Sequence, residues 1–479
     1  MEEYFWDRKQ ELGHLKQSYT SLRTSIFIAM YGRRRVGKTE LIRKFLGALN
    51  TPKLYVYVDL AEKSEILNSF SKEVFDQLGQ TIKFNDWNEF LDFIAEKAAK
   101  EKFILVIDEF QRFVQTSPEF ISRLQKYWDT SLKNKKLMLL LVGSSIGMMH
   151  RVIGSHTGAL YGRSTEKWKI SPFKFAEFRE MFKKLPEEEK IIYYSVFGGT
   201  PYYLNLAQKK NEQGIFDAIN ILMLNKASIL FEEPKNLLEV ENVRTHARYN
   251  SILSSIAEGK DTLKEISDFT GILPTTLPAY IHRLDALLDL VKTREPLFGK
   301  KKLGKYAIKD NFFRFWYKFI YPNQSAINLN NRKLVEGVIR SNINAYTGLI
   351  FEEIIEELLI MHQNKKIKGH DISFDKIGGW WDRNGNEIDI VASNSKGRKL
   401  LVGEVKWTNE KAGAGVLENL VKKAKMINAS GEYTFMIVSK SGFTEECLKK
   451  MKEINALSLD LKEVAALFEN AGKGALYGS

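Results

Sequence analysis

Short, largely apolar runs alternate with helical patterns along the first third of the chain. The runs cover residues 25–29, 53–60, 103–107 and 137–142, and a further strand pattern covers 166–170. Runs of this length that are apolar on both faces are typical of buried parallel strands. Between them, apolar residues recur at helical spacing, as over 65–77 and 87–100. The alternation predicts an α/β fold with a doubly wound parallel sheet.

The turn after the first of these strands carries a phosphate-binding pattern. The spacing G-x-x-x-x-G-K-[ST] is formed by Gly32, Arg33, Arg34, Arg35, Val36, Gly37, Lys38 and Thr39. The glycines let backbone N–H groups and the start of the next helix face a triphosphate. Lys38 would reach the β- and γ-phosphates, and Thr39 would hold Mg²⁺ through its hydroxyl group. The sequence predicts a Walker A loop that binds ATP and Mg²⁺; the alternative is a glycine turn before a basic helix.

The third apolar run ends in two carboxylates, Asp108 and Glu109. The carboxyl ends of parallel strands form the ligand crevice of a doubly wound sheet. Asp108 is suited to hold Mg²⁺ through water, and Glu109 to orient and polarise the water that attacks the γ-phosphate. Together with the Walker A loop, the two acids predict nucleotide hydrolysis.

Three further residues are candidates for the γ-phosphate. Ser144 follows the fourth strand and would lie between the carboxylates and the phosphate loop if the strands are neighbours; ordinary turn chemistry is the alternative. Arg163 precedes the fifth strand, and its guanidinium could stabilise the transferring phosphate of the same subunit or of a neighbouring copy. Arg151 is a weaker candidate. A structural salt bridge is the alternative for both arginines.

These residues resemble archaeal-type P-loop ATPases of the STAND and AAA-like class. The resemblance rests on residues 31–39, 108–109, 143–145, 160–163 and 197–202. It implies an ATP-driven switch whose nucleotide-binding sheet is followed by a helical lid that contains 197–203. Short amphipathic helices over 172–225 suit such a lid, although the glycines and the proline near 200 are also typical of an interhelix turn.

The middle of the chain predicts three helices and a β-ribbon. Helical patterns cover 249–258, 262–269 and 275–290, and strands follow at 291–296 and 304–308. This is the order of a winged helix-turn-helix. His282 and Arg283 would lie on the recognition helix. DNA phosphates could also contact the wing through Lys300, Lys301, Lys302 and Lys305. The alternatives are an interdomain spacer and a solvated lysine run.

The stretch 310–319 is dense in aromatic residues on nearly all sides of a predicted helix. We expect a helix buried between domains, and base stacking is the less favoured alternative.

The last third begins with a polar connector at 323–331 and a helical pattern at 334–361. Strand patterns follow at 376–381, 387–392 and 400–407. Alternation places Glu404 and Lys406 on one face, and Asp389 ends the partner strand across a short hairpin. Two carboxylates can bind Mg²⁺ there, and a lysine can position or deprotonate the water that attacks a phosphodiester. The alternative is a cross-strand ion pair on the sheet edge.

Over about residues 346–439 this pattern resembles the PD-(D/E)XK core of restriction-endonuclease-like proteins. The resemblance implies that Glu352, on the preceding helix, joins Asp389 and Glu404 as a metal ligand and that Lys406 is catalytic. One departure is that no proline precedes Asp389. The metal ligands expected in the whole chain are therefore Thr39, Asp108, Glu352, Asp389 and Glu404.

Composition narrows the choice of partner and compartment. Lys plus Arg exceed Asp plus Glu by 72 − 59 = 13, which favours an anionic polymer, with DNA first, over lysines that serve only solubility. The single cysteine, Cys447, excludes an internal disulfide and suits a reducing cytoplasm. No apolar run approaches the length of a membrane span. We therefore expect a cytoplasmic protein with no membrane association.

A chain of 479 residues is too long for one hydrophobic core. We expect a P-loop ATPase core at 1–170, a helical lid at 171–245, a winged helix at 246–322 and a nuclease-like domain at 323–479. The hypothesis is a Mg²⁺-dependent ATPase that couples ATP binding and hydrolysis to DNA binding and metal-dependent phosphodiester cleavage. The alternative is an ATP-dependent switch whose last domain binds nucleic acid or protein without cleaving it. The chain could also form a homo-oligomer.

Overall fold

The computed structural model describes residues 8–210, 214–240, 246–299, 303–394, 399–427, 429 and 431–474. The chain divides into two compact units. The first comprises Met1–Pro172 with His282–Asp289, and the second comprises Phe173–Ile281 with Leu290–Ser479. Within the described residues, no helix combines the length and the apolar character that a membrane crossing requires.

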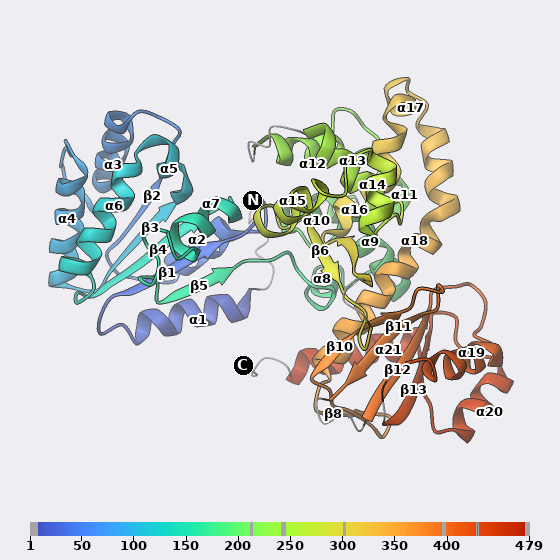
Figure 1. Ribbon diagram of the computed structural model, residues 1–479. Coiled ribbons are helices and arrows are strands. Elements are labelled where there is room, and N and C mark those ends of the chain that lie inside the picture. The colour runs from blue at the N-terminus through green and yellow to red at the C-terminus, as the bar shows by residue number, and fades with distance from the viewer. Residues whose placement is uncertain are drawn as a thin grey trace. The chain divides into compact units, whose positions relative to one another are not determined.

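The first unit is built on a parallel five-stranded sheet with the strand order β2-β3-β4-β1-β5 (Figure 1). Every neighbouring pair is parallel, which confirms the α/β class predicted from the apolar runs. The strands are β1 Ile26–Tyr31, β2 Lys53–Tyr57, β3 Phe103–Asp108, β4 Leu137–Gly143 and β5 Glu166–Lys169. The helices are α1 Lys9–Thr20, α2 Lys38–Gly47, α3 Lys63–Leu78, α4 Trp87–Lys100, α5 Phe113–Thr116, α6 Pro118–Tyr127 and α7 Ile146–Met149.

Helices cover both faces of this sheet. Phe27 and Ala29 of β1 pack into one core with residues of α3, α4 and α6, whereas Ile28 and Met30 pack into a second core with residues of α1 and α2. Successive side chains of a strand point to opposite faces, so burial on both faces requires apolar residues at consecutive positions. In the central strands β1, β3 and β4, polar residues are therefore confined to the strand ends, where the candidate site lies.

The second unit begins with a set of helices. A tight turn separates the second from the third: Gly198 has a φ of 65°, and a Cβ on Gly199 would lie 1.8 Å from the carbonyl oxygen of Phe173. The glycines of this stretch are thus required by the turn. The helices are α8 Phe175–Met181, α9 Glu187–Phe197, α10 Pro201–Gln208, α11 Ile215–Leu222 and α12 Ile229–Val240.

Three helices and an antiparallel ribbon follow in the predicted order. They are α13 His246–Ala257, α14 Leu263–Thr270, α15 Leu277–His282, β6 Val291–Arg294 and β7 Lys305–Ile308. Thr262 and Glu265 form a capping box at the start of α14, and Gly271 ends it with a φ of 69°. The third helix is shorter than the predicted 275–290, because regular α-helical hydrogen bonding ends at His282 and a π-helical turn continues to Leu287.

The aromatic stretch forms α16 Asn311–Phe315 and a π-helical turn, Trp316–Ile320. The side chains of Phe312, Phe313 and Trp316 are fully buried. Burial confirms the packing interpretation and excludes these rings as exposed platforms for bases.

A mixed five-stranded sheet with the order β10-β11-β12-β13-β14 forms the last part of the second unit. The predicted helix, three-stranded meander and later strand correspond to α18 Arg332–Met361, β10 Lys376–Trp381, β11 Glu387–Ser393, β12 Lys399–Lys406 and β13 Glu432–Ser439. The meander is antiparallel, and β13 and β14 continue it in parallel. The other elements are α17 Gln324–Asn328, β8 Lys365–Ile367, β9 His370–Ile372, α19 Ala414–Ala424, α20 Glu445–Glu453, β14 Leu457–Asp460 and α21 Leu461–Gly474.

Candidate functional sites

The phosphate loop joins β1 to α2 at the carboxyl edge of the parallel sheet. Both of its glycines are required by the backbone. A Cβ on Gly32 would lie 2.2 Å from the carbonyl oxygen of Ile170, and Gly37 has a φ of 91°, in the left-handed region. With Gly37 as its N-cap, α2 begins at Lys38 and directs its first N–H groups towards the loop.

Lys38 is held at the centre of this loop. Its Nζ atom donates to the carbonyl oxygens of Gly32 and Arg33, at 2.6 and 2.9 Å. The side chain is 6% exposed, so the cation is kept close to the position where the Walker A pattern predicts phosphate oxygens.

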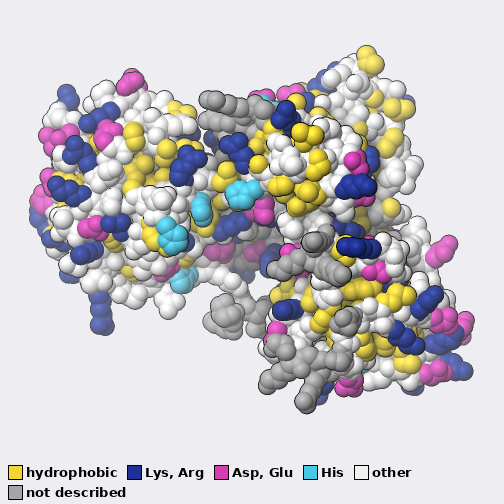
Figure 2. All heavy atoms as spheres, in the orientation of Figure 1, with side chains coloured by type: hydrophobic (Ala, Val, Ile, Leu, Met, Phe, Trp, Pro, Cys, Tyr) yellow, Lys and Arg dark blue, Asp and Glu magenta, His cyan; other side chains and the backbone are white. Residues whose placement is uncertain are grey.

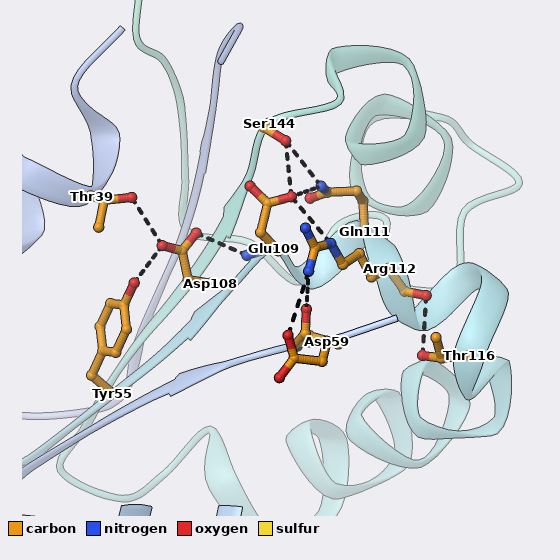
Figure 3. A network of polar contacts seen from close by, with 10 residues as sticks. Thr39, Tyr55, Asp59, Asp108, Glu109, Gln111, Arg112, Thr116 and Ser144 are labelled. Atoms are coloured by element: carbon orange, nitrogen blue, oxygen red, sulfur yellow. Dashed lines mark hydrogen bonds and ion pairs between the residues drawn. The ribbon is translucent and has the colours of Figure 1, made fainter. Parts of the chain in front are cut away.

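Thr39 and Asp108 are brought together, as their predicted shared role requires (Figure 3). The hydroxyl group of Thr39 donates to Asp108 Oδ2 at 3.1 Å. The same oxygen accepts the hydroxyl of Tyr55 at 2.5 Å, and the N–H of Glu109 donates to Oδ1 at 2.8 Å. Burial and the neighbouring Asp108 carboxylate raise the pKa of Tyr55, so this phenol stays a donor at neutral pH. Tyr55 was not predicted, because nothing in the run Lys53–Tyr57 distinguishes its hydroxyl group from that of Tyr57.

Glu109 is held by two polar side chains (Figure 3). Its Oε2 atom accepts from Ser144 Oγ at 2.9 Å and from Gln111 Nε2 at 2.5 Å. Its backbone has a φ of 54°, which is rare for a residue with a Cβ and is often found where function dictates the geometry. Strand β4 lies between β3 and β1, which is the neighbour relation on which the Ser144 prediction depended. In this structure Ser144 contacts Glu109, and its role as a γ-phosphate sensor stays a prediction.

Arg112 is a further residue that the sequence interpretation missed. Its Nη1 atom donates to the carbonyl oxygen of Val58 at 2.9 Å, and its Nε lies 3.6 Å from Glu109 Oε2. The guanidinium also lies 4.9 Å from the centre of the Tyr57 ring. An arginine is thus fixed beside the predicted catalytic acid, within the same unit.

Arg163 lies at the opposite edge of the sheet. Strand β5 is parallel to β1, so residues before β5 lie near the start of β1, whereas the phosphate loop follows its end. Six strand residues separate the two edges by about 20 Å. The guanidinium pairs with Asp129 at 2.7 Å. The prediction of a contact to the phosphate of the same subunit is therefore wrong; a contact to a neighbouring copy stays a prediction, as does the weaker assignment of Arg151.

The first site fits a nucleotide with magnesium. The loop N–H groups and Lys38 suit the phosphates, the oxygens of Thr39 and Asp108 suit a divalent cation, and Glu109 suits an attacking water.

The second candidate site lies where β11 and β12 end their pairing in the second unit. The ladder pairs Ile390 with Gly403, so Asp389 and Glu404 come next and share one face of the sheet. Asp389 Oδ2 accepts the N–H of Val405 at 2.7 Å. Lys406, two residues beyond Glu404, is on the same face. The two strands thus bring together the three charged residues predicted from their spacing.

The Glu404 carboxylate is buried, but only one of its two oxygens accepts hydrogen bonds from the described residues. Its Oε1 atom accepts from Lys406 Nζ at 2.7 Å and from Lys423 Nζ on α19 at 3.5 Å. Its Oε2 atom is buried and has no hydrogen-bond partner among the described residues. Leaving a carboxylate oxygen buried without a partner is costly, so a cation or donor at this position would stabilise the site.

Glu352 and Asp389 show the same excess of negative charge. Burial and the nearby Asp389 raise the pKa of Glu352 to about 8. Burial and the nearby Glu404 raise the pKa of Asp389 to about 6. Asp389 thus repels Glu404, and Glu352 repels Asp389; a divalent cation would relieve this repulsion. Across the described ranges, however, no three His, Cys, Asp or Glu side chains form a ready set of metal ligands.

Glu353, the next residue on α18, has the opposite environment. Its Oε1 atom accepts from Arg314 Nη2 and from Lys292 Nζ, each at 3.1 Å. Burial alone would raise its pKa, but Arg314 and Lys292 outweigh burial and hold the pKa at about 2. Consecutive helical residues point about 100° apart, so adjacent glutamates can face different neighbours. The sequence did not predict this ion cluster.

The predicted DNA-binding cations are distributed differently from the prediction. His282 and Arg283 are exposed, but they belong to the segment that groups with the first unit. Lys305 pairs with Glu387 at 3.6 Å and lies 5.1 Å from the centre of the Trp381 ring. Lys300, Lys301 and Lys302 lie outside the described residues. On the face shown in Figure 2, Lys and Arg side chains are dispersed among acidic and neutral ones.

Comparison with protein families defines the class of protein to which the chain belongs. Residues 5–207 match the family described as "ATPase domain predominantly from Archaea". Residues 316–417 match the family described as "Archaea bacterial proteins of unknown function". Together with the phosphate loop and the two strand-end acids, the first match identifies a P-loop ATPase that binds nucleotide and hydrolyses ATP.

The relatives extend this assignment to nearly the whole chain. The protein MJECL04 of Methanocaldococcus jannaschii, described as uncharacterized, is 34% identical over 91% of this chain and 95% of its own length. The chain belongs to the same family as this archaeal protein. A 42-residue match, 50% identical, covers 9% of this chain and 70% of MJ0423 from the same organism, described as an uncharacterized ATP-binding protein.

Among solved structures, the Walker-type ATPase PABY2304 of Pyrococcus abyssi shares the fold. The similarity has a TM-score of 0.50 at 20% identity and covers 66% of this chain and 97% of that one.

Proposed function

We propose that this ATPase is Mg²⁺-dependent and that its second unit binds DNA and cleaves phosphodiester bonds. In the first unit, Lys38 and the loop N–H groups orient the phosphates, and Thr39 and Asp108 supply oxygens for the cation. The cation, when bound, supplies charge that offsets the phosphates. Glu109 orients the attacking water. Ser144 and Gln111 hold the Glu109 carboxylate in position through their hydrogen bonds to it.

The cleavage proposal depends on one observation, the buried Glu404 Oε2 atom that lacks a partner among the described residues. Asp389 lies on the same face of the neighbouring strand, and both acids suit Mg²⁺. Burial, the largest single influence, lowers the pKa of Lys406, but its hydrogen bond to Glu404 and the negative charges of Glu404, Asp389 and Glu352 together raise the pKa above its ordinary value. Lys406 therefore stays an ammonium group in this structure and is suited to position a phosphate or a water rather than to accept a proton.

DNA binding is assigned to the three helices and ribbon, which we interpret as a winged helix. Its order of elements is that of the DNA-binding motif, and the chain carries a formal net charge of +13. The ribbon, the helices α8–α12 and the acidic site all belong to one compact unit. We therefore propose that changes in nucleotide state move the ribbon and the acidic site together.

The test is incubation of the purified full chain with single- and double-stranded DNA, with and without Mg²⁺ and ATP. Cleavage that requires Mg²⁺ and is lost in Asp389→Ala and Lys406→Ala supports the proposal. Variants that cut as well as the parent would remove the catalytic assignment. ATP hydrolysis by both variants, measured in parallel, controls for folding.

A second candidate is an ATP-dependent switch whose second unit binds nucleic acid or protein without cleaving it. The observation in its favour is that Lys406 and Lys423 both neutralise Glu404, while the described acids form no ready set of metal ligands. DNA binding without cleavage under every metal condition would select this function.

A further inference from the structure

A cleft of about 740 Å³ lies within the second unit, beside the sheet end that carries Asp389 and Glu404. Its walls are the start of α14, the β6–β7 ribbon and the turn that joins β10 to β11. It therefore combines the helix-turn-helix module with the sheet that carries the acidic site. Neither the sequence pattern nor the family matches assign a role to it.

Direct hydrogen bonds fix the two walls to each other. The N–H of Leu297, in the loop of the ribbon, donates to the carbonyl oxygen of Gly379 on β10 at 2.9 Å. The indole N–H of Trp381 donates to the carbonyl oxygen of Leu303 at 2.7 Å. Lys292 of β6 pairs with Glu353 of α18 at 3.1 Å. The ribbon is thus docked on the C-terminal sheet, and the cleft is a fixed feature of the unit.

The cleft leads towards the acidic site. Lys305 lines it and pairs with Glu387 at 3.6 Å. Glu387 lies opposite Trp381 in the β10–β11 ladder and two residues before Asp389 on the same face of β11. Two strand residues span about 7 Å, so a chain in the cleft needs to continue by about one nucleotide to reach Asp389.

The lining favours an anionic chain. Lys264, Lys305 and Arg383 contribute three cations, and Asp268 and Asp382 contribute two acids. The Asp382 Oδ1 atom accepts the N–H groups of Asn384 and Asn386 at 2.8 and 3.0 Å. Lys305 is paired with Glu387, so the cations that meet an anionic chain first are Lys264 and Arg383. Lys264 and Arg383 are exposed, one on each wall. Phosphates passing between the walls would meet a cation on either side.

The lining favours a single strand over a duplex. Tyr306 contributes an aromatic side chain on which an unpaired base can stack, whereas the bases of a duplex are already stacked on one another. We infer that this cleft receives a single DNA strand and guides it to the acidic site. Only the destination of the strand rests on the proposed cleavage function; its binding does not.

The experiment compares the full-length parent with a Lys264→Glu/Arg383→Glu double variant. Fluorescence anisotropy measures the affinity for a labelled 20-nucleotide single-stranded DNA, for the same sequence as RNA and as a duplex. We expect the affinity of the variant for the single strand to fall at least about tenfold. The slope of log K against log salt concentration should become shallower by about 1.4, because each lost phosphate contact removes about 0.7. Duplex affinity should be unchanged.

The matched control is Lys449→Glu/Lys452→Glu, which reverses the same number of charges at exposed positions on α20. An equal loss in the control, equal loss for the duplex, or no loss in the double variant would overturn the inference. An RNA strand that binds as well as DNA and responds equally to the variant would overturn the assignment to DNA. Cleavage is scored separately with Asp389→Ala: strand binding without any cleavage by the parent rejects the nuclease proposal and leaves this inference standing.

Discussion

Two buried carboxylates at strand ends, Asp108 in the first unit and Glu404 in the second, are satisfied to different degrees. Asp108 accepts hydrogen bonds on both oxygens, from Thr39, Tyr55 and a backbone N–H. Glu404 places two lysines on one oxygen and none of the described donors on the other. The Asp108 carboxylate is therefore satisfied by donors of its own unit, whereas one oxygen of the Glu404 carboxylate has no hydrogen-bond partner among the described residues. This difference predicts opposite responses to substitution and to added cations.

The largest effect is expected for Lys38→Ala. The lysine lies at the centre of the phosphate loop, and loss of one preorganised cationic contact in such a site costs roughly 100- to 1000-fold in rate. Phosphate release should fall to background. Lys44→Ala, exposed on the same helix, is the control and should retain parental ATP hydrolysis. Substantial ATP hydrolysis by Lys38→Ala would contradict the assignment of the phosphate site in the first unit.

Glu109→Gln should separate nucleotide binding from hydrolysis. The amide keeps the shape but cannot polarise water as a carboxylate does, and general acid–base groups contribute roughly 100- to 10,000-fold. Hydrolysis should fall by at least about 100-fold, while ATP affinity, measured by fluorescence with a labelled nucleotide, changes less than about threefold. A parallel loss of affinity would mean that Glu109 has a structural role.

Glu353→Gln should destabilise the second unit. Removing one partner of a buried ion pair costs about 3–5 kcal/mol, because it leaves the cations Arg314 and Lys292 uncompensated. The Glu353 pKa of about 2 lies below the ordinary 4.5. Its contribution to stability is therefore complete above pH 4.5 and is lost as the pH falls through about 2. Denaturant unfolding at pH 7 and pH 3 measures this; an equal midpoint for parent and variant at pH 7 would contradict the ion-pair assignment.

Asp389→Asn should have a smaller effect of the opposite sign. The folded pKa of about 6 exceeds the ordinary 3.8, so the stability that this residue contributes falls as the pH rises from about 4 to 6. An amide cannot ionise and still accepts the Val405 N–H. The variant should be more stable than the parent at pH 7.5, by up to about 3 kcal/mol, and similar to it at pH 4. A less stable variant at pH 7.5 would show that the carboxylate is already compensated.

Much of the first site was predictable because its determinants are local. Lys38 and Thr39 belong to one loop, and Asp108 and Glu109 end one apolar run, so strand pairing alone brings the two groups together. Arg163 could not be placed without the strand order, since only the parallel pairing of β5 with β1 puts it at the opposite edge. Tyr55, Gln111 and Arg112 depended on side-chain packing that no spacing reveals.

In the C-terminal part, spacing predicted that Asp389, Glu404 and Lys406 would meet. It did not reveal Lys423, which reaches Glu404 from a later helix, or the Arg314–Glu353–Lys292 cluster. These contacts join elements that are far apart in the sequence. They determine how much of the negative charge of the buried glutamates is neutralised. The early end of α15 at His282 could not be predicted from the sequence either, because the apolar periodicity continues through the π-helical turn that follows.

We propose that the acidic site of the second unit takes up a divalent cation. Mn²⁺ binding to the nucleotide-free full chain, followed by electron paramagnetic resonance at pH 7.5, tests this uptake directly. We expect at least one bound ion in the parent that is lost in both Asp389→Asn and Glu404→Gln and kept in Lys449→Glu/Lys452→Glu. Equal Mn²⁺ binding by the parent and the two acidic-site variants would contradict it.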